Sequence, residues 1–285
     1  MDRNELQYLI ELLDDENEQS AQLAMAALLK GDDENLDRCL DSLQKIRNSR
    51  LRKRVRQLES ALNARRKRRS LHTRLKRSTL LDGVIQLHLC WFDNDQADLV
   101  YRQWNDLLSD YRIRCAGHPT LQSAAEFLNS KGFHAPMNDD LAADFYCIGI
   151  VLDDKYGSDL MLAIITAELL RACGVACTVA RYADDYCVMD RACNLVLPAF
   201  DWRYCEHGEL NGQYPYPVQD HQLLRYTASV LLTCAVGSDS YRYIFTIGQA
   251  LSQFLGQTQE SGNAFLPYPY CSNNPSTNKN QGDLS

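Results

Sequence analysis

Residues 145–190 read FYCIGIVLDDKYGSDLMLAIITAELLRACGVACTVARYADDYCVMD, and this stretch decides the fold. After a turn at Gly157, leucine, isoleucine and alanine occupy most sides of a helical segment, so we expect that helix to be buried at the centre of a domain. Gly174 is typical of the residue that ends a helix. The alternation of apolar residues at 175–179 and the segment 186–189 predict two strands after the helix.

The charge of the chain is distributed unevenly. The 285 residues, of which 45% are hydrophobic, can bury one substantial core and a small accessory unit. Their 30 basic and 37 acidic side chains give a net charge of −7. Residues 45–77 hold fifteen of the basic side chains and one acid, Glu59, whereas the first 44 residues hold twelve acids and three basic side chains. A basic segment therefore comes after an acidic one.

The composition predicts a cytoplasmic protein that does not cross a membrane. The N-terminus is acidic, where a signal peptide would be basic and then apolar. The longest apolar runs are about ten residues and are interrupted by Glu168, far short of the roughly twenty residues that span a bilayer. Eleven cysteines with mostly apolar neighbours are typical of buried thiols in a reducing compartment.

Residues 4–62 are expected to form four short helices in two pairs. Apolar residues recur every three or four positions in 6–13, 36–43 and 51–62, and a small-residue face covers 21–28. Ser49 is the expected N-cap of the fourth helix. The segment LLDDENEQSAQLAMAAL of the first pair resembles the helix–turn–helix unit of HEAT repeats. The resemblance implies that residues 1–63 form a HEAT-like helical unit that packs on the next part of the chain.

The segment ARRKRRSLHTRLKR, residues 64–77, has two interpretations. Clustered Lys and Arg attract phosphates, so this segment is a candidate site for nucleic acid or an acidic partner. The candidate binding residues are Arg65, Arg66, Lys67, Arg68 and Arg69. The alternative is a solvated connector whose charge complements acidic parts of the chain. The connector is favoured because no aromatic residues are interleaved for base stacking and the chain is acidic overall.

The pattern from residue 78 to residue 257 is that of a larger domain. Helices are expected at 80–92, 97–111 and 119–132, ahead of the central helix. A strand and turn are expected in NLVLPAFDW, and two helices, roughly 220–235 and 240–255, close the domain. Residues 258–285 contain too few apolar side chains to order themselves, so we expect a flexible tail.

The block IVLDDKYGSDLMLAIITAELLRACGV is similar to one in the SirB1 family, a branch of the transglutaminase-like superfamily. Weaker blocks extend the resemblance over residues 78 to about 200. It implies a mainly helical α+β fold of the papain-like kind, in which the central helix packs on a small antiparallel sheet. The active enzymes of the superfamily carry a cysteine at the start of this helix, a histidine in the next strand region and an acid behind it.

The resemblance places an aspartate at each of these three positions. Asp159 stands at the nucleophile position, Asp185 at the histidine position and Asp201 at the position of the third acid. An aspartate at a helix start is a good N-cap but a poor acyl nucleophile, and no base occupies the matching position. The resemblance therefore implies a non-catalytic protein-interaction or regulatory module. The alternatives are a cysteine-dependent hydrolase or transferase with a displaced nucleophile such as Cys187, and nucleic-acid binding through 45–77.

Two clusters of side chains are candidate metal sites. Carboxylates near the start of the central helix would suit Mg²⁺ or Ca²⁺, but they serve equally as caps and loop acids beside Lys155. They are Asp153, Asp154, Asp159, Asp184 and Asp185. A zinc site from Cys187, Cys193, Cys205 and His207 has a spacing that matches no common knuckle. We therefore expect no metal and no cofactor, and a protein partner.

Overall fold

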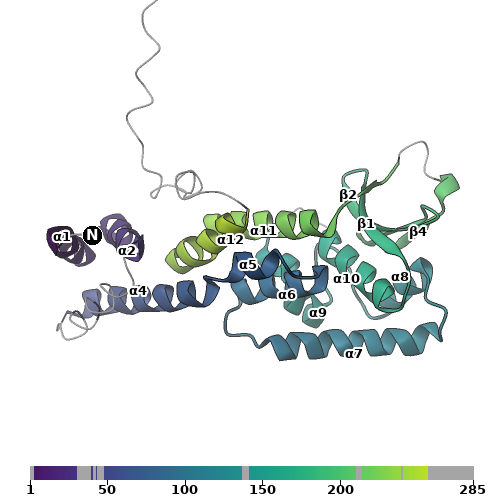
Figure 1. The fold of residues 1–285 in the computed structure, drawn as a ribbon, viewed down its shortest axis with the longest axis horizontal. Coiled ribbons are helices and arrows are strands. Elements are labelled where there is room, and N and C mark those ends of the chain that lie inside the picture. Colours follow the sequence, from purple (N-terminus) through teal and green to yellow (C-terminus); the bar gives the residue numbers. More distant parts are fainter. Residues whose placement is uncertain are drawn as a thin grey trace, which may run out of the picture. The chain divides into compact units, whose positions relative to one another are not determined.

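The computed structural model describes residues 3–30, 40, 43, 48–136, 141–209, 214–238 and 240–255. The chain divides into two compact units, Met1–Arg68 with Ala235–Ser285 and Arg69–Cys234. Figure 1 labels many of the elements of both. This division differs from the expected ranges 1–63, 64–77 and 78–257, because the basic segment is split between the units and the last helix belongs to the first. The predicted tail, 258–285, lies outside the described residues.

The first unit is helical. Its described elements are α1 (Arg3–Leu13), α2 (Glu18–Lys30), α4 (Ser49–Arg68), the π-helix η4 (Tyr243–Gly248) and α12 (Gln249–Phe254). Three of the four predicted N-terminal helices are confirmed. The other, over 36–43, lies outside the described residues except for Leu40 and Leu43, which are both buried. The predicted helix at 240–255 is correct in place, but its middle is π-helical rather than regular.

Side-chain amides, rather than hydroxyls, cap α2 and α4. Asn17 Oδ1 accepts a hydrogen bond from the backbone N–H of Gln19 at 2.9 Å, at the start of α2. Asn48 Oδ1 accepts from Arg50 N at 3.0 Å and from Leu51 N at 3.2 Å, which is the geometry of an N-cap. The expectation that Ser49 caps α4 is therefore wrong by one residue.

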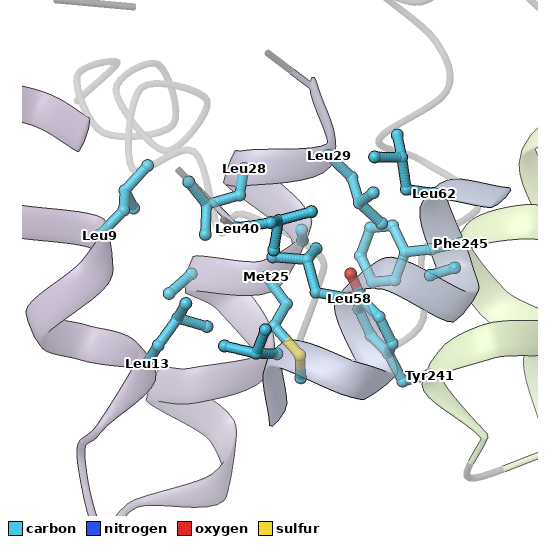
Figure 2. Packing of buried hydrophobic residues seen from close by; sticks show 14 of the residues in the cluster. Leu9, Leu13, Met25, Leu28, Leu29, Leu40, Leu58, Leu62, Tyr241 and Phe245 are labelled. Carbon is cyan, nitrogen blue, oxygen red and sulfur yellow. The ribbon is translucent and has the colours of Figure 1, made fainter. Parts of the chain in front are cut away.

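The core of the first unit draws on both ends of the chain. Leucines of α1, α2 and α4 form one buried cluster with Tyr241, Ile244 and Phe245. Figure 2 shows these side chains converging from the N-terminal helices and the C-terminal segment. Burial of this apolar surface is why residues 240–255 belong with the first unit.

The second unit combines helices with one small sheet. Its α-helices are α5 (Leu71–Leu75), α6 (Leu80–Trp91), α7 (Ala97–Cys115), α8 (Leu121–Ser130), α9 (Ile148–Asp154), α10 (Asp159–Ala172) and α11 (Asp220–Gly237), whose last residues count with the first unit. The described part of this unit also has three short 3₁₀ turns, η1 (Ala143–Tyr146) between α8 and α9, and η2 (Pro198–Phe200) and η3 (His207–Glu209) within the strand region. Ten of the fourteen residues of α10 are buried, which confirms the predicted central helix.

The sheet is antiparallel and has the strand order β4-β3-β2-β1-β5. The strands are β1 (Cys177–Tyr182), β2 (Asp185–Asp190), β3 (Leu195–Leu197), β4 (Arg203–Cys205) and β5 (Tyr216–Pro217). α10 lies against β1 and β2 (Figure 1). The fold is therefore α+β and mainly helical, as predicted. β4 and β5 were not anticipated, because they are three and two residues long and lack the apolar run that marks β3.

None of the helices in the described ranges is both long enough and apolar enough to cross a membrane.

Candidate functional site

The start of α10 is held in place by the residues just before it. A side chain at Gly157 would place its Cβ 2.6 Å from Val151 Cγ1, so only glycine fits this turn. Ser158 N donates to Phe145 O at 3.0 Å, and Ser158 Oγ accepts from Met161 N at 3.2 Å. Ser158 is therefore the N-cap of α10, and Asp159, which the sequence suggested for that role, is the first helical residue.

Asp159 fastens the helix to the sheet. Its Oδ1 accepts the backbone N–H of Leu160, and its Oδ2 accepts that of Tyr186, both at 2.7 Å. β3 pairs with β2 only at Val188 and Met189. The Tyr186 amide therefore has no partner in β3 and donates to the Asp159 carboxylate instead. Burial raises the pKa of Asp159 above its ordinary value, and the two backbone amides partly offset that rise. At the position that the resemblance assigns to a nucleophile, the structure has a structural carboxylate.

Asp185 lies next to this carboxylate, at the first position of β2. It pairs with Tyr182 across the β1–β2 hairpin. Burial raises the pKa of Asp185, and the negative charges of Asp159 and Asp184 raise it further, while Arg181 opposes the rise. The structure therefore brings two of the three aspartates together. In the described part of the chain, no histidine hydrogen-bonds to either of them.

Asp201 does not join the other two aspartates. It comes directly after η2 in the left-handed backbone region, with φ of 48°, and its side chain is exposed. Within the described ranges, no hydrogen bond joins its side chain to Asp159 or Asp185. An exposed acid of this kind cannot orient a buried base.

Tyrosines surround the pair of carboxylates. Tyr146 comes from η1, Tyr186 from β2 and Tyr226 from α11, and the rings of Tyr186 and Tyr226 are 5.6 Å apart. Burial raises the pKa of Tyr146 and that of Tyr186 to about 12. The guanidinium of Arg181 lies 5.3 Å from the centre of the Tyr186 ring. Sequence reasoning missed Tyr146 and Tyr226, because no local pattern connects residues so far apart in the chain.

The thiols near the site are poorly suited to catalysis. Cys187 is fully buried, its Sγ donates to Ala180 O at 3.4 Å, and burial raises its pKa to about 12. Burial likewise raises the pKa of Cys147 well above its ordinary value. Cys177 lies away from the α10 start, with its Sγ donating to Ala167 O, and burial raises its pKa to about 11. A nucleophilic thiol needs the opposite shift. The arrangement offers hydrogen-bond acceptors, phenols and one cation, but no activated nucleophile.

The described residues contain no group of three or more histidine, cysteine, aspartate or glutamate side chains placed to hold a metal ion. Cys193 lies in the turn after β2, with φ of 62°, while Cys187 faces the core and His207 is exposed in η3. The candidate zinc ligands therefore lie in different environments.

His88 is a histidine of the core in α6. Its side chain is buried, its Nε2 lies 3.0 Å from Asp95 Oδ2, and its Nδ1 has no hydrogen-bond partner among the described residues. Burial lowers the pKa of His88, against the opposing charge of Asp95. A Cβ at Gly149 would come within 2.5 Å of the imidazole, so α9 packs closely on this ring. The histidine serves packing.

The basic segment is partly used inside the first unit. Arg65 Nη1 donates to the backbone carbonyl of Leu29. Arg68 is buried, and its Nη1 donates to Thr246 Oγ1 at 3.2 Å. Arg66, Lys67 and Arg69 are exposed. Two of the five candidate binding residues therefore support the fold of the first unit, and three are on the surface.

Comparison with known proteins finds no match: no family model, no curated protein and no solved structure matches this chain. The resemblance to the SirB1 family therefore rests on the sequence blocks alone.

Proposed function

We propose that this chain is a non-catalytic protein-interaction or regulatory module that acts in the cytoplasm. In this proposal, a HEAT-like unit precedes a transglutaminase-like domain similar to those of the SirB1 family. The proposal requires no cofactor. One observation carries it: both carboxylate oxygens of Asp159 are engaged by backbone amides, those of Leu160 and Tyr186. A side chain that holds α10 on β2 is not available to attack a substrate.

The state of the cysteines supports the same conclusion. None of the described cysteines forms a disulfide, which suits a reducing compartment. Four of them are buried: Cys90, Cys147, Cys187 and Cys205. A displaced nucleophile would need a nearby imidazole or another cation to form its thiolate, whereas burial raises the pKa of the cysteines closest to the α10 start.

A row of tyrosines beside the α10 start, Tyr216, Tyr186 and Tyr226, supports a protein partner; we call it the tyrosine row. Arg181 is paired with Tyr186 on one side and with Tyr216 of β5 on the other, so these three side chains share a face of the sheet. Tyr226 contacts Tyr186 and continues the row. Tyr216 is 75% exposed and Tyr226 is 43% exposed. Tyrosine and arginine are enriched at the centres of protein interfaces, because they combine apolar area with a polar tip.

A turnover assay tests the absence of catalysis. The purified chain is incubated with p-nitrophenyl acetate and with a glutamine peptide plus a fluorescent amine. We expect no ester hydrolysis and no transamidation above those of a Cys187→Ser variant. Turnover that disappears when any one cysteine is changed to serine would show that the chain is an enzyme.

Photo-crosslinking tests the interaction surface. A photoreactive phenylalanine analogue is placed at Tyr216 in the tyrosine row and, as a matched control, at Ile113 of α7, which is 77% exposed in the same unit. In extracts of cells that express the chain, we expect a discrete adduct from position 216 only. Adducts of equal yield at both positions, or no adduct at either, would remove the support for this surface.

A further inference from the structure

The first unit contains a groove of about 800 Å³, which shares no residue with the tyrosine row. One wall is the polar face of α4, and others come from α2 and from residues 240–242, directly before η4. Departures from regular α-helix such as π-helical turns are frequent at functional sites. The volume is that of a site for a ligand or a short peptide segment rather than for a single ion.

The groove is positively charged. Arg52, Lys53 and Arg56 of α4 line it and are exposed, and Arg242 lines it from the other side. Among the described residues, Arg52, Lys53 and Arg56 form no ion pair and no side-chain hydrogen bond. Like charges one helical turn apart destabilise a helix. A ligand that carries negative charge would remove this repulsion.

The single acid in the lining does not neutralise these cations. Glu18 Oε2 accepts a hydrogen bond from Arg54 Nη2 at 2.9 Å, and Arg54 is buried. Arg54 Nη1 also donates to Leu13 O at 2.7 Å and to Asp15 O at 2.5 Å. Arg54 therefore holds α4 and the N-terminal helices together, whereas Arg52, Lys53 and Arg56 of the same helix face the groove.

The remaining lining favours a polypeptide over other anions. Ser49, Ser60 and Ser240 supply hydroxyl groups, and the apolar part of the lining comes from Met25 and Tyr241, both buried. A nucleic acid would need exposed rings on which its bases could stack, and Tyr241 is only 7% exposed. A single phosphate would need donors that converge on one point, whereas these cations are spread along more than one turn of α4.

We propose that this groove binds an acidic peptide segment of a partner protein, with its carboxylates on Arg52, Lys53 and Arg56. This site goes beyond the tyrosine row, since it lies in the other unit and uses none of the same residues.

Fluorescence anisotropy with the full chain tests the site. The probe is a fluorescein-labelled peptide of alternating glutamate and leucine, and the reference is the same peptide with glutamine in place of glutamate. We expect the acidic peptide to bind more tightly and to weaken as salt is raised. The double variant Lys53→Glu, Arg56→Glu should bind it at least about tenfold more weakly, because two attractions become repulsions.

The matched control is Lys67→Glu, an exposed cation of the same helix outside the groove lining. It should leave the affinity unchanged within about twofold. Circular dichroism of both variants confirms that the helices are retained. Equal binding of the acidic and neutral peptides, or equal losses in the two variants, would overturn the proposal. Tighter binding of a single-stranded oligonucleotide that depends on Lys67 would overturn it in favour of nucleic acid. The crosslinking result at Tyr216 bears on neither outcome.

Discussion

Replacing Asp159 separates a structural carboxylate from a catalytic one. In the variant Asp159→Ala, the amides of Leu160 and Tyr186 lose their acceptor, and both hydrogen bonds are 2.7 Å long. Hydrogen bonds to a charged group contribute about 1.5–3 kcal/mol each, less the cost of burying that charge. We therefore expect the second unit to lose about 2–4 kcal/mol in its free energy of unfolding.

The variant Asp159→Asn provides a graded comparison. Its side-chain oxygen can accept one of the two amide hydrogens, while its NH₂ group meets the other as a second donor. Asparagine also carries no charge to desolvate. We expect a loss of about half that of alanine. Asp154→Ala, which changes an exposed acid at the end of α9, should stay within about 0.5 kcal/mol of the unchanged protein.

Tryptophan fluorescence during urea unfolding is the appropriate assay. All three tryptophans, Trp91, Trp104 and Trp202, are buried in the second unit, so the signal reports on that unit alone. An Asp159→Ala variant as stable as Asp154→Ala would refute the structural role of the carboxylate. So would an asparagine variant that is less stable than the alanine one.

Two further predictions concern His88 and Arg54. Burial lowers the pKa of His88 in the folded chain below the 6.5 of a free histidine. As pH falls below 6.5, the unfolded chain therefore binds this proton before the folded chain does. The stability that the neutral ring contributes is lost as pH falls through the folded pKa. Between about pH 7 and pH 5, tryptophan-monitored stability should fall further in the unchanged protein than in His88→Gln, and parallel curves would contradict this. The lysine of Arg54→Lys cannot reach all three acceptors of the guanidinium, Leu13 O, Asp15 O and Glu18 Oε2. The free energy of unfolding of the first unit should therefore fall by about 1–3 kcal/mol, and amide hydrogen exchange in α1 and α2 should become faster. Arg50→Lys, at an exposed ion pair with Glu16, should change that exchange little, and equal effects would contradict the role of Arg54.

The helices were readable from the sequence because their information is local. An apolar side chain at every third or fourth residue predicts α6, α7, α8 and α10 without reference to the rest of the chain. The β1–β2 hairpin could be read in the same way, from the alternation of its side chains. Errors of one residue, such as Ser49 for Asn48, arise where two neighbouring residues can both cap.

The candidate site depended on packing. That Asp159 would reach the Tyr186 amide, and that Tyr226 would lie against the Tyr186 ring, is a result of how α10, α11 and β2 meet. The groove in the first unit likewise needs Arg242 to line the same cavity as Arg56, although the two lie far apart in the chain. The sequence by itself therefore determined the longer helices, the hairpin and the absence of a cysteine at the α10 start, but not the short helices α5 and α9. Only the tertiary structure decided which side chains meet, because contact between distant residues is set by the burial of whole faces and not by spacing along the chain.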